Sequence, residues 1–157
     1  MSAVPRPAAA AAANTPATKP SLTLKRRLKA PPAKVYAAWT DPAQIARWWG
    51  PKQTDEVTKA EIDLRVGGGF RIVFRDGDEE NDVSGVYREV MPVAKLVFTW
   101  AWRSTPERES LVTVALAPDG AGTLMTFTHE QFFDEAARDR HHQGWQGAFD
   151  KLERCYP

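Results

Sequence analysis

The sequence has a single cysteine, little net charge and no long apolar run, and each shortage excludes a class of protein. One cysteine among 157 residues, Cys155, rules out an intramolecular disulfide and suits a reducing compartment, so the cytoplasm is the expected location. No stretch approaches the roughly 18 apolar residues of a membrane span, so membrane insertion is not expected.

Aromatic residues are absent from the first 35 positions. Residues 1–20 are mostly Ala, Pro and Thr without periodicity, and such a segment cannot bury enough apolar surface to offset its ordering. We therefore predict a disordered Ala/Pro-rich tail over 1–20 and a single domain over 21–157. A secretory signal is the alternative for the tail, but its basic region would be only Arg6 and its apolar core only a run of alanines.

The charge of the predicted domain is almost balanced. Removing Arg6 and Lys19 with the tail leaves 19 Lys and Arg against 20 Asp and Glu, a net charge of −1. Nucleic-acid-binding domains are usually strongly basic, so no nucleic-acid partner is expected.

A strand and two short helices are predicted first. Residues 21–30 place Leu22, Leu24 and Leu28 on one face, as a half-buried strand does. Pro31-Pro32 ends the strand and opens a short helix, and a second helix starts at Asp41-Pro42 and stops at Gly50-Pro51.

Two adjacent tryptophans, Trp48 and Trp49, close the second helix. Neighbouring helical residues point about 100° apart. We therefore expect Trp48 to pack inward and Trp49 to splay towards a rim or a cavity mouth.

Six further runs, separated by turn signals such as Asp-Gly, alternate between apolar and polar residues. They are "VTKAEIDL", "GGGFRIVFR", "DVSGVYREV", "KLVFTWAW", "ESLVTVAL" and "TLMTFTHE". With the first strand they predict a seven-stranded antiparallel sheet. Bulky side chains that share a strand face and should form the interior are Phe70, Ile72, Phe74, Phe98, Trp100, Trp102 and Phe127.

The last element, residues 134–156, is predicted to be a long helix. Trp145, Ala148, Phe149 and Leu152 follow the i, i+3, i+4, i+7 spacing of a buried stripe. Glycine inside a helix usually has a packing reason, so Gly144 and Gly147 are expected to let the helix backbone approach the concave face of the sheet.

This order of elements resembles the helix-grip fold, and several motifs narrow the resemblance. The segments "AKVYAAWTDPAQIARWWGP", "DLRVGGGFRI", "SGVYREVMPVAKLVFTW", "FTHE" and "HHQGWQGAFDKLERCY" resemble the SRPBCC/START-like superfamily. Within it, they resemble the group named after the activator of the Hsp90 ATPase homologue. The resemblance implies an α+β helix-grip fold, in which the sheet wraps around the C-terminal helix and leaves a cavity for hydrophobic or amphipathic small molecules.

Two histidines are candidates for polar contacts in that cavity. His129 shares a strand face with Phe127, and His141 lies four residues before Trp145 on the inner helix face. Their unperturbed pKa lies near neutrality, so they can bind a polar head group or pass protons; hydrogen bonding within the wall is the alternative. "HEQFF" lacks the second histidine of HExxH, and we assign no catalytic residue, metal or cofactor.

Tyr87 is a candidate for its hydroxyl group if its strand face points inward. Glu89 shares that face in a regular strand, and the alternation leaves the direction of the face open. The full set of candidate ligand-binding residues is Trp49, Phe70, Ile72, Tyr87, Trp100, Phe127, His129, His141 and Trp145.

The expected function is binding of a hydrophobic or amphipathic small molecule, without defined catalysis. The alternatives are a chaperone-associated protein-interaction module and an enzyme similar to the aromatase/cyclases of the superfamily. An Hsp90-type chaperone is not expected as a partner, because the eukaryotic activator carries a separate N-terminal domain where this chain has an Ala/Pro tail. A homodimer is left open.

Overall fold

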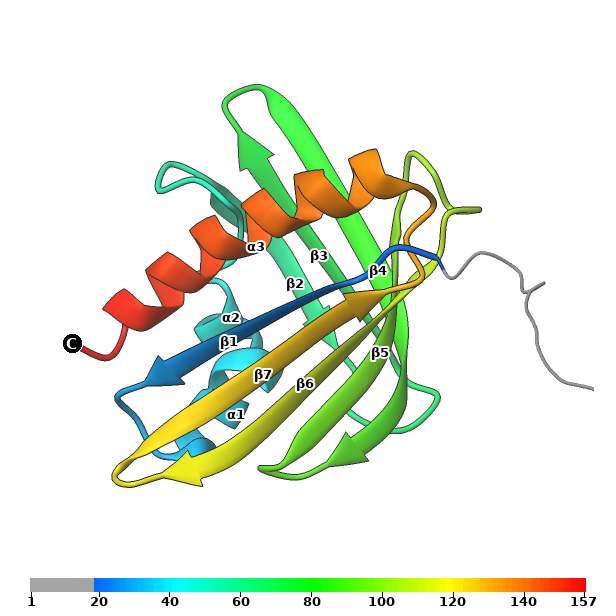
Figure 1. Ribbon diagram of the computed structural model, residues 1–157. Helices are drawn as coiled ribbons and strands as arrows, with labels where there is room; N and C mark the ends of the chain where they lie inside the picture. Colours follow the sequence, from blue (N-terminus) through cyan, green and yellow to red (C-terminus); the bar gives the residue numbers. More distant parts are fainter. Residues whose placement is uncertain (1–18) are drawn as a thin grey trace, which may run out of the picture.

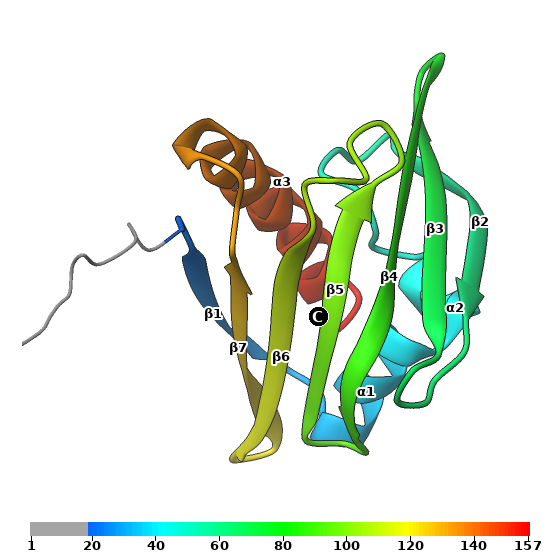
Figure 2. The ribbon, with the colours of Figure 1, turned by 90° about the vertical axis from the view of Figure 1, so that its right-hand side faces the viewer.

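The computed structural model describes residues 19–157 (Figures 1 and 2). The predicted tail over 1–20 lies outside the described residues except for its last two positions. One of these, Pro20, accepts a hydrogen bond on its carbonyl oxygen from the N–H of Phe132 at 3.1 Å.

Seven strands form one antiparallel sheet, as predicted. In chain order the strands are β1 (Leu22–Leu28), β2 (Glu56–Ile62), β3 (Gly69–Asp76), β4 (Glu79–Met91), β5 (Lys95–Trp102), β6 (Ser110–Asp119) and β7 (Gly122–Glu130). Within the sheet they follow the order β1-β7-β6-β5-β4-β3-β2, so only β1 is placed out of sequence, beside β7. The tip of the β3–β4 hairpin projects beyond the rest of the sheet (Figure 2).

Three helices cover the concave face of the sheet (Figures 1 and 2). They are α1 (Pro32–Thr40), α2 (Pro42–Ile45) and α3 (Glu135–Arg154). The side chain of Asp134 caps α3 by accepting a hydrogen bond from the N–H of Ala137, and that of Asp41 caps α2 in the same way through Ala43. The fold is the predicted α+β helix-grip arrangement.

The predicted stripe of α3 is buried against the sheet. Near the end of α3, Arg26 of β1 pairs with Asp150 at 3.0 Å and with Glu153, and its guanidinium lies over the ring of Phe149. These contacts fasten the C-terminal half of α3 to the β1 edge of the sheet.

Trp48 packs inward as predicted, but Trp49 is buried as well and does not splay to a rim. Trp48 and Trp49 are 0% and 4% exposed. Helix α2 ends at Ile45, and the following residues form turns, so the two indoles are not held to the divergence of a regular helix. Trp48 packs on Trp39 with ring centroids 4.8 Å apart, whereas Trp49 reaches towards α3, 5.6 Å from the ring of Trp145.

Of the two glycines in α3, Gly147 makes room for a close approach and Gly144 does not, and the approaching segment is a loop and not the sheet. A Cβ at Gly147 would lie 2.2 Å from the carbonyl oxygen of Pro51, whereas one at Gly144 would lie 3.9 Å from the nearest Pro51 atom. The buried ammonium of Lys151, one turn further along α3, donates hydrogen bonds to the carbonyl oxygens of Trp49 (2.9 Å) and Lys52 (2.8 Å). Residues 49–52 are therefore held against the middle of α3.

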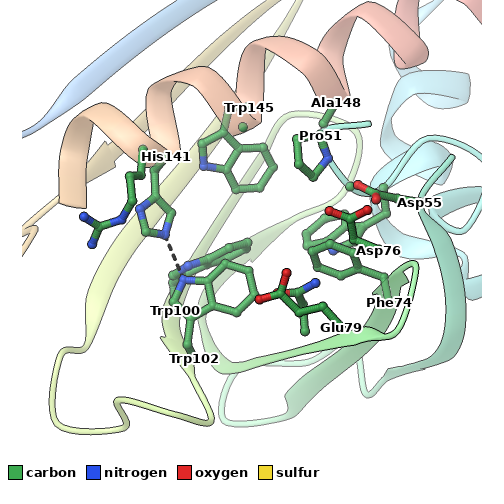
Figure 3. Close-up of a pocket in the computed structure, with 15 residues that line it drawn as sticks. Pro51, Asp55, Phe74, Asp76, Glu79, Trp100, Trp102, His141, Trp145 and Ala148 are labelled. Atoms are coloured by element: carbon green, nitrogen blue, oxygen red, sulfur yellow. Dashed lines mark hydrogen bonds between the residues drawn. The ribbon is translucent and has the colours of Figure 1, made fainter. Parts of the chain in front are cut away.

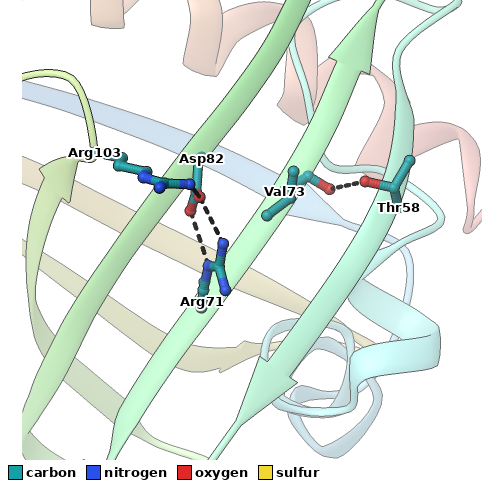
Figure 4. Close-up of polar contacts among 5 residues, drawn as sticks. All are labelled: Thr58, Arg71, Val73, Asp82 and Arg103. Carbon is teal, nitrogen blue, oxygen red and sulfur yellow. Dashed lines mark hydrogen bonds and ion pairs between the residues drawn. The ribbon is translucent and has the colours of Figure 1, made fainter.

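A carboxylate on the outer face ties β3 to β4 (Figure 4). Asp82 accepts two hydrogen bonds from the guanidinium of Arg71, at 3.1 and 2.8 Å, and Arg103 approaches to 3.6 Å. The hydrogen bonds from Arg71 lower the pKa of Asp82 below its usual value. On the neighbouring strand, the hydroxyl of Thr58 donates to the carbonyl oxygen of Val73 at 3.4 Å (Figure 4).

Within residues 19–157, none of the helices has the length and apolar character needed to cross a membrane.

Candidate binding pocket

A pocket of about 370 Å³ lies between the N-terminal half of α3, the loop after α2 and strands β3 to β5 (Figure 3). This volume is at the lower end of the range for small-molecule sites. Its lining residues are Trp49, Gly50, Pro51, Asp55, Phe74, Asp76, Glu79, Asn81, Trp100, Trp102, Arg140, His141, Gly144, Trp145 and Ala148.

Four indole rings form the inner wall of the pocket. Trp100 occupies the centre, with its ring centroid 5.8 Å from Trp49, 5.5 Å from Trp102 and 5.0 Å from Trp145. The ring of Phe74 continues the wall 6.2 Å from Trp102. The pairs are tilted or edge-to-face, geometries that aromatic side chains favour. The wall is mostly apolar, and the buried Nε1 of Trp100 has no hydrogen-bond partner among residues 19–157.

His141 forms one polar edge of the pocket and is fixed by two hydrogen bonds. Its Nε2 accepts from the indole N–H of Trp102 at 2.9 Å, and its Nδ1 lies 2.7 Å from the carbonyl oxygen of Ala137 (Figure 3). A carbonyl oxygen can only accept, so Nδ1 carries the proton and the ring is neutral. Burial lowers the pKa of His141, in agreement with this assignment.

His129 lies behind the wall in a fully bonded network and is 0% exposed. Its Nδ1 accepts from the indole N–H of Trp145 at 3.1 Å, so its Nε2 carries the proton and donates to the hydroxyl oxygen of Ser110 at 2.7 Å. That hydroxyl donates in turn to the carbonyl oxygen of Trp100. Burial, and secondarily the neighbouring His141, place the pKa of His129 well below its usual value.

Three carboxylates form the other polar edge, on the side of the pocket away from His141 (Figure 3). Asp55 accepts a hydrogen bond on Oδ2 from the backbone N–H of Lys52 at 2.9 Å, and its Oδ1 is buried without a hydrogen-bond partner among residues 19–157. Asp76 pairs with the ammonium of Lys52 at 2.6 Å. Glu79, at the start of β4, has no ion-pair partner in the part of the chain that the structure describes.

The nine candidate residues separate into three groups. Trp49, Trp100, His141 and Trp145 line the pocket. Phe70, Ile72 and Tyr87 border a second space of about 10 Å³, which has room for about one water molecule. Phe127 and His129 are fully buried and line neither space. The structure therefore brings only the first group together around a space large enough for a ligand.

Tyr87 points inward and Glu89 does not share its face. The register of β4 against β5 shifts between these two residues, so a bulge turns Glu89 outward, where it pairs with Lys95 at 3.2 Å. Burial raises the pKa of Tyr87. Strict alternation along the strand could not reveal this bulge.

The set of site residues predicted from the sequence did not include several residues that line the pocket. Phe74 and Trp102 lie on the predicted inward faces, so the alternation could have added them to the set. Asp76 and Glu79 belong to the acidic Asp-Gly turn, which the sequence marks only as a turn. Asp55 and Arg140 come from a loop and from the exposed side of a predicted helix, and no local pattern points to them.

The fold and this pocket define the chain as a helix-grip protein with an open interior site. A family model described as "Activator of Hsp90 ATPase homolog 1-like protein" matches residues 29–156, and the chain belongs to this family. The resemblance seen in the sequence is thus confirmed. No curated protein matches the chain.

Solved bacterial structures share the fold over most of its length. Protein CV1439 from Chromobacterium violaceum is 27% identical, with a TM-score of 0.77 over 87% of this chain and 96% of its own. The AHSA1 (SPO3351) protein from Silicibacter pomeroyi is 28% identical, with a TM-score of 0.76 over 86% and 96%. CalU16 from Micromonospora echinospora is 29% identical, with a TM-score of 0.61 over 84% and 73%.

Proposed function

We propose that the protein binds an amphipathic small molecule in the pocket between α3 and strands β3–β5. The observation that carries this proposal is the difference in volume between the two spaces in the interior. Most of the space between helix and sheet is filled, and the second space there holds about 10 Å³, whereas the pocket offers about 370 Å³ against an aromatic wall. Pockets of this kind, mostly apolar with a few placed polar groups, are typical of ligand sites.

The two histidines support binding and not acid–base chemistry. Each ring is neutral, and each has its unprotonated nitrogen occupied by an indole N–H. Accepting a proton at that nitrogen would break the bond to Trp102 or Trp145. We therefore propose that His141 positions the wall of the pocket and offers no free base to a substrate.

Titration with the neutral dye Nile red tests the proposal. Saturable binding of one dye molecule per chain, with a blue-shifted emission, is expected. Gly144 lines the pocket, so Gly144→Leu should weaken dye binding by about tenfold, because a branched side chain then occupies pocket volume. Gln143→Leu adds the same side chain at the adjacent exposed position and is the matched control. Equal binding by both variants would contradict the proposed site.

Native mass spectrometry of gently purified protein gives an independent test. A stoichiometric adduct that is released on denaturation, and that is missing from Gly144→Leu, is the expected result. An adduct retained equally by this variant would place the ligand elsewhere.

We also propose that the protein acts in the cytoplasm, because its single cysteine, half-buried against the core, suits a reducing compartment. Recovery of the protein outside the cytoplasmic fraction of its cells would contradict this location.

A further inference from the structure

We propose that the pocket selects an organic cation, namely a protonated amine on an apolar body. This inference rests on the proposed binding function and specifies the charge of the ligand. Two features of the lining carry it: the excess of carboxylates at one edge and the indole faces beside them.

The charges around the pocket favour a positive ligand. Three carboxylates line it against one guanidinium, that of Arg140. Lys52 lies outside the lining and neutralises Asp76, but Glu79 remains without an ion pair among residues 19–157. The other nearby ammonium, that of Lys151, is buried, donates to two backbone carbonyl oxygens and attracts Asp55. Lys52 attracts Asp55 and Glu79 as well as Asp76. Within the lining itself, the carboxylates of Asp55, Asp76 and Glu79 outnumber the single cation Arg140, and Glu79 can pair with a cationic ligand.

The wall beside this edge is made of the ring type that binds cations best. The face of an aromatic ring carries the negative part of its quadrupole, and tryptophan gives the strongest cation–π contacts. Four indoles and the ring of Phe74 line the pocket, so an ammonium group has aromatic faces and carboxylates within one small space. Aromatic cages are a recurrent solution for binding quaternary ammonium groups.

Anionic and neutral ligands suit this lining less well. An anion would meet three carboxylates and the negative ring faces, and the one cation in the lining, Arg140, does not balance them. A neutral apolar ligand would remove water from the exposed carboxylate of Glu79 without replacing its lost hydrogen bonds, which is unfavourable. A cationic ligand avoids the repulsion that an anion meets, and it also replaces the hydrogen bonds that the carboxylates lose when water leaves.

Three probes with one apolar body separate these cases: phenylbutylamine, phenylbutanol and phenylbutyrate. Their binding to the full chain is measured by calorimetry at neutral pH. We expect the amine to bind about tenfold more tightly than the alcohol, and the carboxylate to bind most weakly. Raising the salt concentration should weaken the amine more than the alcohol.

Glu79→Gln removes the unpaired charge at an exposed position and keeps the size of the side chain. It should reduce the affinity for the amine by about threefold to tenfold and leave that for the alcohol unchanged. Glu80→Gln is the matched control, because adjacent strand residues point to opposite faces. Its affinity for the amine should stay within about twofold of the wild type.

The outcomes distinguish the claim that the pocket selects a cation from the claim that it binds a ligand at all. Equal binding of amine and alcohol, or tighter binding of phenylbutyrate, would overturn charge selection and leave the binding function standing. An unchanged amine affinity in Glu79→Gln would also overturn it. No binding of any probe, together with no saturable binding of Nile red, would overturn both claims.

Discussion

Replacing Gly147 by alanine should destabilise the protein, although alanine is the better helix former. Both mid-helix glycines gain up to about 1 kcal/mol of helix propensity when changed to alanine. At Gly147 the new Cβ would lie 2.2 Å from the carbonyl oxygen of Pro51, so the loop must retreat by about 1 Å to restore a van der Waals separation. Overpacking of this kind typically costs about 1–3 kcal/mol.

The retreat of the loop has a second cost at Lys151. Lys151 is 7% exposed, and its ammonium donates to the carbonyl oxygens of Trp49 and Lys52 at 2.9 and 2.8 Å. Lengthening these bonds leaves a buried charged donor poorly paired, a loss of about 1–3 kcal/mol. After subtracting the gain in propensity of about 1 kcal/mol, we expect Gly147→Ala to lower the free energy of unfolding by about 1–5 kcal/mol.

Gly144→Ala is the matched control, because it lies in the same helix and its added Cβ makes only an ordinary contact, 3.9 Å from Pro51. This variant should be neutral or more stable by up to about 1 kcal/mol. Urea unfolding at neutral pH, followed by circular dichroism, measures both values. Equal stabilities of the two variants would refute the argument that the loop is held against Gly147.

Three further predictions concern the polar groups. The free energy of unfolding should fall between pH 7.5 and 5.5, by up to about 1 kcal/mol for His129 and by less for His141, because burial lowers both pKa values in the folded state and the unfolded imidazoles take up protons near pH 6.5. A flat profile in urea unfolding would contradict the lowered pKa values. Trp102→Phe keeps an aromatic ring, although a smaller one, and removes the N–H that donates to Nε2 of His141, so the pKa of His141 should rise in an NMR titration. An unchanged pKa would show that this bond is not formed in solution. Asp82→Asn should lower the urea midpoint at pH 7 and have a smaller effect at pH 2, because the stability that comes from the lowered pKa of Asp82 is present above the unfolded pKa near 3.9 and is lost as the pH falls. An equal loss at both pH values would mean that the ion pair with Arg71 is not its source.

The fold could be predicted from the sequence because its signals are local and periodic. The alternation in "TLMTFTHE" buries Met125, Phe127 and His129 as expected, each 0% exposed. The i, i+3, i+4 stripe of α3 and its cap at Asp134 are likewise determined by residues close in the chain. Such patterns predict burial correctly because the apolar face of each helix or strand is removed from water when the protein folds.

The pocket depends on where loops and registers place residues distant in the chain. Asp55 reaches it from a loop after α2, and Glu79 from the tip of a hairpin. Phe127 satisfies every local criterion for a cavity residue, but Trp145 packs on it with ring centroids 4.5 Å apart and fills the space. Periodicity identifies the inward face; it does not say which part of the interior stays empty.

The six indole N–H signals in a ¹H–¹⁵N NMR spectrum give the most direct test of the central claim that a ligand enters this pocket. Trp49, Trp100, Trp102 and Trp145 line it, whereas Trp39 and Trp48 do not. On titration with Nile red, the signals of the first four should shift together and saturate while the other two stay in place. Shifts confined to Trp39 and Trp48, or no shift at saturating dye, would contradict the claim.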